Sequence, residues 1–290
     1  MLGILLIKKP AGITSHDVVN QVRRLFGTKR VGHAGTLDPL ATGLLVVAVG
    51  PATRFLQYLP LEPKEYVADI EFGRATETYD AEGVTTQTGE VPSDLEAVLA
   101  EKLPAFKGLI QQLPPMHSAV KVNGKPLYAY ARQGQQLTRE HRTVHITAYE
   151  TLSIESPIFR ARIVCSGGTY IRSLAHDLGQ TVGCGAYLAR LVRTRVGRFS
   201  LDEGVILGEA SPANLIPLHE ALLPMPLLAL DEAQVAMVRE GRPIGMADPP
   251  NAYHVALLEP KGLVFSIARV HGNLLQPECV IPIGVTYEST

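Results

Sequence analysis

Asp38 is the only carboxylate in the stretch His33–Leu45, HAGTLDPLATGLL, and it lies directly before a proline. The residue before a proline is restricted to an extended backbone, and Gly35 and Gly43 let the chain turn sharply on both sides. Such a carboxylate is held in place and can act as a nucleophile or a base. The same residues are also typical of an Asp-Pro turn, which the local sequence alone favours.

Three predicted elements position this loop. Leu2–Ile7 is an apolar run of strand length, and Leu44–Val49 is continuously apolar, as in a strand buried on both faces. Between them, Thr14 or Ser15 can cap a helix whose apolar residues recur on one face. Asp38 is therefore expected in a loop that leads into a core strand.

A second polar corner follows Phe159–Cys165, whose alternation predicts a strand. A glycine pair ends that strand in CSGGTYIRSLAHDLG, and Thr169 can start a helix. Tyr170 and Arg172 then lie at a strand-to-helix corner, where many enzymes place polar side chains beside a pocket. An arginine in the first turn of a helix is at the wrong end of the helix dipole, which favours a buried partner.

The remaining segments predict the rest of the architecture. Lys64–Phe72 alternates as a strand, and Ser93 with Glu96 forms a capping box ahead of a helix. Val122–Lys125 contains the Asn-Gly pair of tight hairpins, and the composition near 212–226 indicates a domain seam. We expect an α+β domain with a mixed, mostly antiparallel sheet, followed by a small β-rich domain.

Charge is segregated along the 290 residues, although the formal net charge is only −1. Asp17 is the only acid in residues 1–37, and residues 102–139 and 178–201 contain none. Each zone alone is typical of a solvated face. The three together favour one cationic groove that would bind a polyanion.

Cysteine usage and the N-terminal apolar run limit the class of protein. Cys165, Cys184 and Cys279 are odd in number and form no close pair, which argues against a disulfide framework or a zinc site. The run that begins at Leu2 ends at Lys8 after six residues, too short for a signal peptide or a membrane span. We expect a soluble, cytoplasmic protein.

The stretch around Asp38 resembles the signature of the TruB-type pseudouridine synthases, which make pseudouridine at position 55 in the T-loop of tRNA. Four further blocks resemble the family's motifs in the family's order: KPAGITSHDVV, YDAEG, PPMHSAVKVNGKPLYAYAR and GGTYIRSLAHDLG. Together they are spread over about the first 200 residues. The ordered set is specific, and it reverses the preference for a simple turn at Asp38.

The resemblance implies three catalytic residues. Asp38 corresponds to the essential nucleophile, which attacks C1′, adds at C6 of the base, or assists loss of the C2′ proton. Arg172 corresponds to the arginine that keeps this carboxylate charged and aimed, since burial alone would raise the pKa of Asp38. Tyr66 corresponds to the tyrosine that stacks on the uracil and relays the C5 proton. Because the reaction is an isomerisation, it implies no cofactor and no metal.

The resemblance also implies five substrate-binding residues. His33 corresponds to the histidine that fills the space of the flipped nucleotide, although a lone histidine is more often structural. Tyr170 and Leu191 are expected to line the uracil pocket, and Leu191 is nearly as typical of an ordinary core. Lys9 and Asp80 match positions with supporting roles near the aspartate and the RNA.

The resemblance divides the chain into a catalytic domain, residues 1–226, and a PUA-like domain, residues 227–290. The segment at about 115–142 corresponds to an insertion that grips the RNA. The expected partner is the T-arm stem-loop of tRNA, read after base flipping. We expect a monomer with no obligatory protein partner and no membrane association.

Two other function classes remain open from the residues. The chain could be an RNA-binding or RNA-folding module in which the Asp38 loop is only a turn. It could also be a retaining glycoside hydrolase, which needs a second carboxylate about 5 Å from the nucleophile. Loss of pseudouridine formation in Asp38→Asn with retained tRNA binding would distinguish a synthase from an RNA-binding module. Release of free uracil from the substrate would support a glycoside hydrolase.

Overall fold

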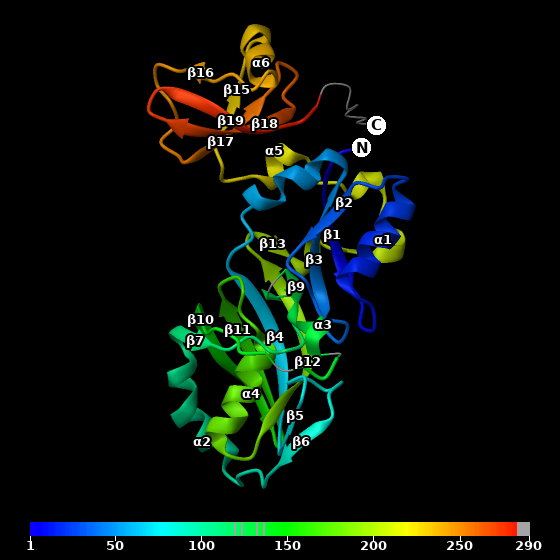
Figure 1. The fold of residues 1–290 in the computed structure, drawn as a ribbon, viewed down its shortest axis with the longest axis vertical. Coiled ribbons are helices and arrows are strands. Elements are labelled where there is room, and N and C mark those ends of the chain that lie inside the picture. The colour runs from blue at the N-terminus through cyan, green and yellow to red at the C-terminus, as the bar shows by residue number, and fades with distance from the viewer. Residues whose placement is uncertain (119, 123, 132, 136, 283–290) are drawn as a thin grey trace.

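The computed structural model describes residues 1–118, 120–122, 124–131, 133–135 and 137–282 (Figure 1). Within them the largest sheet has ten strands. Its main path runs β14 (Val205–Ile206), β1 (Gly3–Lys9), β3 (Thr42–Val49), β12 (Ala186–Val196), β4 (Lys64–Phe72), β11 (Ile158–Cys165), β10 (Arg142–Glu155) and β7 (Gly108–Gln112). Two further strands, β2 (Val31–Ala34) and β13 (Phe199–Ser200), pair with β3 and β12.

The sheet is mixed and mostly antiparallel, which confirms the predicted fold class. Among the described strands of this ten-stranded sheet, only the pairs β1–β14 and β3–β12 are parallel. The pair β3–β12 matters for the site, because β3 follows the Asp38 loop and β12 carries Leu191. The sheet therefore brings residues 38 and 191 to one region of the molecule.

Strand β3 is buried along nearly its whole length because layers cover it on both faces. Leu45, Val47 and Val49 pack with helix α1 (Ser15–Leu25). Leu44 and Val46 face the opposite layer, which includes the 3-10 helix η1 (Gly50–Tyr58). The continuous apolar run predicted this arrangement. Thr14 caps α1 through a capping box with Asp17.

The other half of the sheet is covered by α4 (Ile171–Val182) and α2 (Leu95–Lys102), which is followed by η2 (Leu103–Phe106). The predicted capping box of Ser93 and Glu96 is wrong. Helix α2 begins one residue later, after Asp94, and has no side-chain cap hydrogen bond. Glu96 therefore lies at the second helical position, whereas a capping box needs the third.

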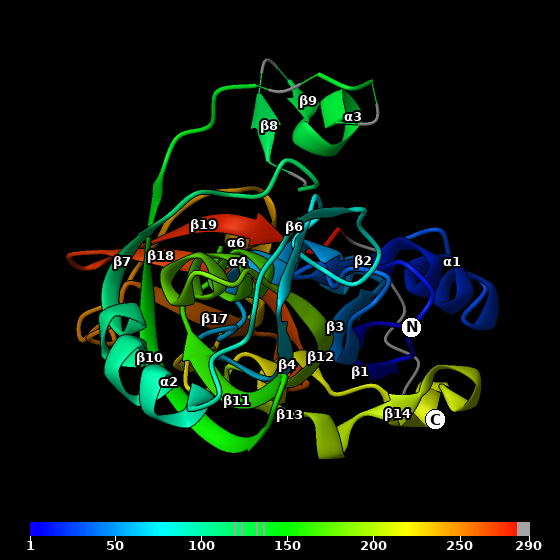
Figure 2. The same ribbon diagram turned by 90° about the horizontal axis from the view of Figure 1, so that it is seen from below.

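Two small hairpins extend from the large sheet. The first pairs β5 (Arg74–Thr76) with β6 (Thr85–Thr88). The second pairs β8 (Lys121–Val122) with β9 (Lys125–Pro126) and leads into α3 (Leu127–Ala131). Figure 2 shows β8, β9 and α3 projecting away from both larger sheets. The predicted hairpin is confirmed by this pairing, although Asn123 lies outside the described residues.

A five-stranded sheet forms the C-terminal part of the fold. Its order is β15 (Leu227–Ala229), β17 (His254–Leu258), β18 (Val264–His271), β19 (Leu274–Val280) and β16 (Ile244–Gly245), with helix α6 (Glu232–Arg239) beside it. The connection before it contains η3 (Leu201–Glu203), η4 (Leu207–Glu209), η5 (Pro212–Asn214) and α5 (Leu218–Ala221). Apolar residues of α5 and η1 pack against β17 and β18, so the two sheets share a core.

Two properties of the described part of the chain bear on function. None of its helices has the length and apolarity that crossing a bilayer requires. No group of three or more His, Cys, Asp and Glu side chains within that part could hold a metal ion.

Candidate active site

A cleft of about 760 Å³ opens where the Asp38 loop, β4, β12 and the start of α4 meet. Asp38 lines it together with six other residues that the sequence predicted for the site: His33, Tyr66, Asp80, Tyr170, Arg172 and Leu191. These residues come from segments that are up to 158 positions apart, from His33 to Leu191. The strand order of the sheet is what gathers them.

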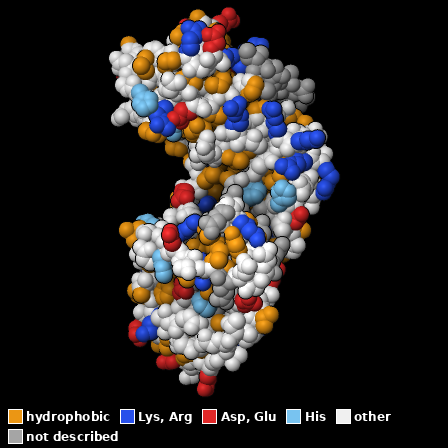
Figure 3. Space-filling view, in the orientation of Figure 1, with side chains coloured by type: hydrophobic (Ala, Val, Ile, Leu, Met, Phe, Trp, Pro, Cys, Tyr) orange, Lys and Arg blue, Asp and Glu red, His pale blue; other side chains and the backbone are white. Residues whose placement is uncertain are grey.

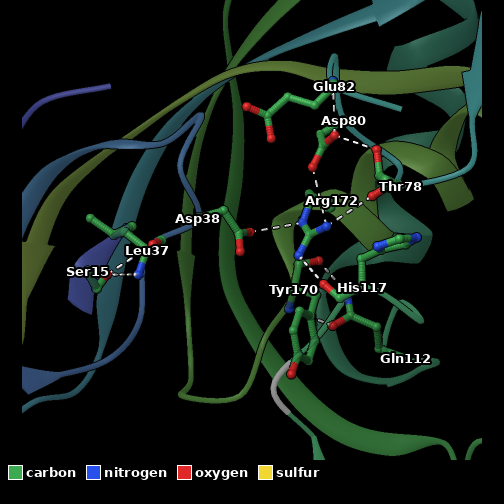
Figure 4. A network of polar contacts seen from close by, with 10 residues as sticks. All are labelled: Ser15, Leu37, Asp38, Thr78, Asp80, Glu82, Gln112, His117, Tyr170 and Arg172. Carbon is green, nitrogen blue, oxygen red and sulfur yellow. Dashed lines mark hydrogen bonds and ion pairs between the residues drawn. The ribbon is translucent and has the colours of Figure 1, made fainter. Parts of the chain in front are cut away.

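The Asp38 carboxylate forms an ion pair with Arg172, with a distance of 3.0 Å between Oδ2 and Nε (Figure 4). The Arg172 side chain is 6% exposed, whereas the Asp38 side chain keeps 41% of its surface accessible. A buried cation thus holds a carboxylate that a ligand in the cleft can still reach. This geometry is what the helix-dipole argument for Arg172 predicts.

Every nitrogen of the Arg172 guanidinium has a partner. Besides Asp38, Nη1 donates to the Thr78 carbonyl at 3.1 Å and to Asp80 Oδ2 at 3.3 Å, and Nη2 donates to the His117 carbonyl at 2.8 Å. The planar, five-donor guanidinium suits this many fixed acceptors. Arg172 therefore cannot rotate away from Asp38 without breaking several hydrogen bonds.

Asp80 is the second carboxylate on Arg172, and its side chain is buried. It accepts hydrogen bonds from the Thr78 hydroxyl at 2.5 Å and from the Glu82 backbone N–H at 3.1 Å. Figure 4 shows Asp80 and Asp38 on different sides of the guanidinium. With its oxygens engaged in this way, Asp80 supports Arg172.

The pKa of Asp38 is raised above the ordinary value of an aspartate. The largest cause is loss of solvation in the cleft, which disfavours the charged form. Arg172 opposes this shift, Asp80 adds to it, and Lys9 opposes it more weakly. The carboxylate is therefore poorly solvated, and the positive charge of Arg172 favours its ionised form.

Lys9 holds the Asp38 loop in place through hydrogen bonds to backbone carbonyls. Its ammonium donates to the carbonyls of Pro10 at 2.9 Å, Pro39 at 3.4 Å and Ala41 at 2.7 Å. Burial lowers the pKa of Lys9 to about 8. We expected Lys9 among the substrate-binding residues, but it is only 2% exposed and lies under the loop, so its contacts are with the protein backbone.

Two further residues that the sequence analysis missed hold the same loop. The Ser15 hydroxyl donates to the Leu37 carbonyl at 3.0 Å and accepts from the Leu37 N–H at 2.8 Å. Arg193, which is 1% exposed, donates to the carbonyls of Leu44 and Gly35 at 2.8 and 2.9 Å. Strand β12 also carries Arg190 and Arg195, so the residue type of Arg193 did not single it out.

Aromatic and apolar side chains form the walls of the cleft. Tyr66 and Leu191 are each 7% exposed, and burial raises the pKa of the Tyr66 phenol. Tyr170 is held at its backbone by Gln112, which accepts from the Tyr170 N–H at 2.7 Å and donates to its carbonyl at 3.0 Å. Gln112 was not predicted, because the pair is separated by 58 positions.

His33 lines the cleft from β2 and is half-buried. Burial is the main cause that lowers its pKa, and the nearby charge of Arg193 acts in the same direction. Its Nδ1 is buried and has no hydrogen-bond partner among the described residues. The ring is therefore favoured in its neutral form.

The three basic zones do not all face one groove, because the third zone is split between two places. Arg23, Arg24, Lys29 and Arg30 follow one another around the end of α1, and Figure 3 shows Lys and Arg side chains gathered on one shoulder of the molecule. The third zone is divided instead. Arg193 lines the cleft, whereas Arg190 lies in a separate pocket with Asp69 and Arg160. Alternate residues of a strand point to opposite faces.

The chain is similar to known proteins over most of its length. Residues 23–171 match the TruB family pseudouridylate synthase N-terminal domain, and residues 172–225 match the tRNA pseudouridylate synthase B C-terminal domain. A protein named tRNA pseudouridine synthase B from Dechloromonas aromatica is 40% identical over 97% of this chain and 96% of its own. A relative of the same name from Dehalococcoides mccartyi is 44% identical over 88% of each chain.

A solved structure shares the fold of this chain. A chain in the crystal structure of a Cbf5-Nop10-Gar1 complex superimposes with a TM-score of 0.70 at 27% identity, covering 97% of this chain and 85% of that one. The fold is thus that of a pseudouridine synthase, an isomerase. The chain belongs to the TruB family of pseudouridylate synthases.

Proposed function

We propose that this chain converts uridine 55 in the T-loop of tRNA to pseudouridine, with Asp38 as the reacting carboxylate. The observation that carries the proposal is the pair of Asp38 and Arg172. An accessible, poorly solvated carboxylate is held at 3.0 Å by a buried guanidinium in a cleft. Desolvation strengthens a carboxylate both as nucleophile and as base. Family membership supplies the substrate class.

In the reaction, the bond from ribose C1′ to uracil N1 breaks, the base rotates, and a bond forms from C1′ to C5. The proton that leaves C5 is balanced by one taken up at N1, so no electrons or atoms enter. Attack at C1′, addition at C6 and removal of the C2′ proton each need an ionised carboxylate at the sugar face. Arg172 meets that need by opposing the effect of burial on the Asp38 pKa.

The uridine has to leave the stacked loop of the tRNA before Asp38 can reach it. A cleft of about 760 Å³ has room for a flipped nucleotide. Tyr66, Tyr170 and Leu191 line the cleft, and in this proposal they enclose the base while Tyr66 also relays the C5 proton. His33, at the cleft and in its neutral form, fills the space that the nucleotide leaves.

The T-arm stem-loop would be gripped by the insertion at about residues 115–142, whose hairpin projects from the sheets. Residues 1–226 act as the catalytic domain and residues 227–290 as a PUA-like domain in this proposal. The enzyme works in the cytoplasm as a single chain, without an obligatory protein partner. Phosphate contacts would supply most of the affinity.

The proposal is tested by mapping pseudouridine in an unmodified tRNA transcript after incubation with the purified chain. We expect one pseudouridine, at position 55, and none in a transcript with cytidine at that position. Absence of the product, or modification scattered over other uridines, contradicts the proposal. Release of free uracil would support the glycoside hydrolase alternative.

The same assay with Asp38→Asn separates an enzyme from an RNA-binding module. We expect this variant to bind the transcript with nearly wild-type affinity and to make no pseudouridine. Because asparagine preserves the size of the side chain, lost binding would indicate that Asp38 has a structural role. Undiminished modification would contradict the assignment of Asp38.

A further inference from the structure

The aromatic rings of Tyr79 and His176 stack beside the active site. Their centroids are 3.8 Å apart and their planes are inclined by 16°. Tyr79 lies in the turn between β5 and β6, and His176 lies in α4. Neither residue lines the cleft. The stack therefore joins two elements of the site without contacting the space where substrate would bind.

The turn around Tyr79 has an unusual backbone. With φ of 65°, Tyr79 is the only residue other than glycine with positive φ in the described part of the chain. This conformation is unfavourable for a tyrosine and persists where surrounding contacts impose it. Hydrogen bonds to β12 pin the turn, since Leu188 donates to the Tyr79 carbonyl at 2.9 Å and Ala81 donates to the Leu188 carbonyl at 3.1 Å.

The residues on either side of Tyr79 are partners of Arg172. Nη1 of Arg172 contacts the Thr78 carbonyl at 3.1 Å and Asp80 Oδ2 at 3.3 Å. His176 follows Arg172 by four positions, which places both side chains on one face of α4. The turn between β5 and β6 therefore contacts one face of α4 in two ways, through the polar contacts of Arg172 and through the stacked rings of Tyr79 and His176.

The contact between Tyr79 and His176 depends on the rings alone. His176 Nδ1 is buried and accepts or donates no hydrogen bond among the described residues. Burial lowers the pKa of His176, so the neutral imidazole is the favoured form. A phenyl ring could therefore replace the imidazole without loss of any polar contact seen in the structure.

We propose that the stack of Tyr79 on His176 is a positioning device that sets the turn against α4 and thereby aims Arg172 at Asp38. Both are positioning residues, because they act through Arg172 and do not touch the reacting atoms. The inference rests on the proposed function of Asp38. It predicts that removing either ring lowers turnover more than it weakens tRNA binding.

The test compares His176→Ala with His176→Phe in single-turnover and steady-state assays on tRNA transcript. We expect kcat to fall about tenfold or more in His176→Ala with KM changed less than about twofold, because small misplacements of catalytic groups are costly. His176→Phe should restore kcat to near the wild-type value. His271→Ala, which removes an exposed histidine of the C-terminal sheet, is the matched control.

Tyr79→Gly separates the ring from the backbone, since glycine adopts positive φ without strain. We expect kcat to fall in Tyr79→Gly and to stay near wild type in Tyr79→Phe. If Tyr79→Gly is fully active, the unusual backbone is sufficient and the stack has no positioning role. In the double variant of Tyr79→Gly with His176→Ala, the loss should be no greater than in one single variant.

The pH profile supplies a readout that a purely structural role would not move. Charged groups reach Asp38 from three elements: Arg172 in α4, Asp80 in the turn and Lys9 in β1. If the stack aims Arg172, its loss in His176→Ala reduces the effect of Arg172 on the pKa of Asp38. The pKa of Asp38 then rises, and the acid limb of kcat shifts to higher pH. An unshifted limb together with wild-type kcat overturns the inference. Failure of the wild-type chain to make pseudouridine would instead contradict the proposed function.

Discussion

Two aspartates contact the same arginine, and their surroundings differ. Asp38 is 41% exposed and lies in a loop that leads into β3, whereas Asp80 is 5% exposed and engages Thr78 and Glu82 as well as Arg172. A carboxylate that is accessible from the cleft can react with a substrate. A buried carboxylate whose oxygens all accept hydrogen bonds instead serves to orient the group that it contacts. The comparison divides the site into a reacting and a supporting half.

Substituting each of the two aspartates separately tests whether one reacts and the other supports. We expect Asp38→Asn to lower pseudouridine formation by about 10⁴-fold or more, which is the scale of losing a catalytic nucleophile. Asp80→Asn should lose much less. Equal losses in single-turnover rate for the two variants would remove the distinction between them.

Arg172→Ala is the next largest expected effect. It removes the cation that opposes the burial of Asp38 and leaves the carbonyls of Thr78 and His117 without their donor. We expect turnover to fall by about 10²- to 10³-fold, because an electrostatic partner in a dry site is lost. The pKa of Asp38 then rises, so the acid limb of the rate profile should move to higher pH. An unchanged profile would count against the pairing.

Asp80→Asn is expected to shift the acid limb the other way. The negative charge of Asp80 raises the pKa of Asp38, so its removal should lower that pKa and extend activity to lower pH. We expect turnover at neutral pH to fall by about tenfold, since Arg172 loses one anchor while three acceptors remain. A limb that moves to higher pH in this variant would show that Asp80 acts by some other means.

The smallest expected effect concerns the loop beneath Asp38. The pKa of Lys9 is about 8 in the folded chain and 10.5 ordinarily, so between these values the unfolded state binds more protons. The free energy of unfolding contributed by Lys9 therefore rises with pH across that window and is lowest below it. Lys9→Met should flatten this rise, measured by denaturant unfolding from pH 7 to 10.5. An identical slope in the variant would contradict the burial of the charge.

The strands and the paired residues of the site could be predicted from the sequence because local patterns encode them. Alternation identified β4, and a misplaced charge at the start of α4 indicated a buried partner for Arg172. The supports of the site were harder to predict, because Gln112 and Arg193 act on backbone groups that are distant in the sequence. Backbone acceptors carry no residue-type signal, so only the folded sheet reveals them.

The helix boundaries show the same limit at short range. Ser93 and Thr169 both have the side chains of typical caps, yet α2 begins after Asp94 and α4 after Tyr170. Packing of Leu95 and Ile171 into the core fixes where each helix begins. The Thr169 hydroxyl instead donates to the Ser166 carbonyl at 2.8 Å. Tertiary packing thus outweighed the local capping preference.

The most direct test of the account is a carbon-13 NMR titration of the Asp38 carboxyl, set beside the pH dependence of single-turnover pseudouridine formation. We predict that the pKa of Asp38 lies above the ordinary aspartate value in the wild-type chain, rises further in Arg172→Ala, and coincides with the acid limb of the rate in both proteins. An acid limb that does not follow the titration of Asp38 would contradict the claim that this carboxylate, kept ionised by Arg172, is the reacting group.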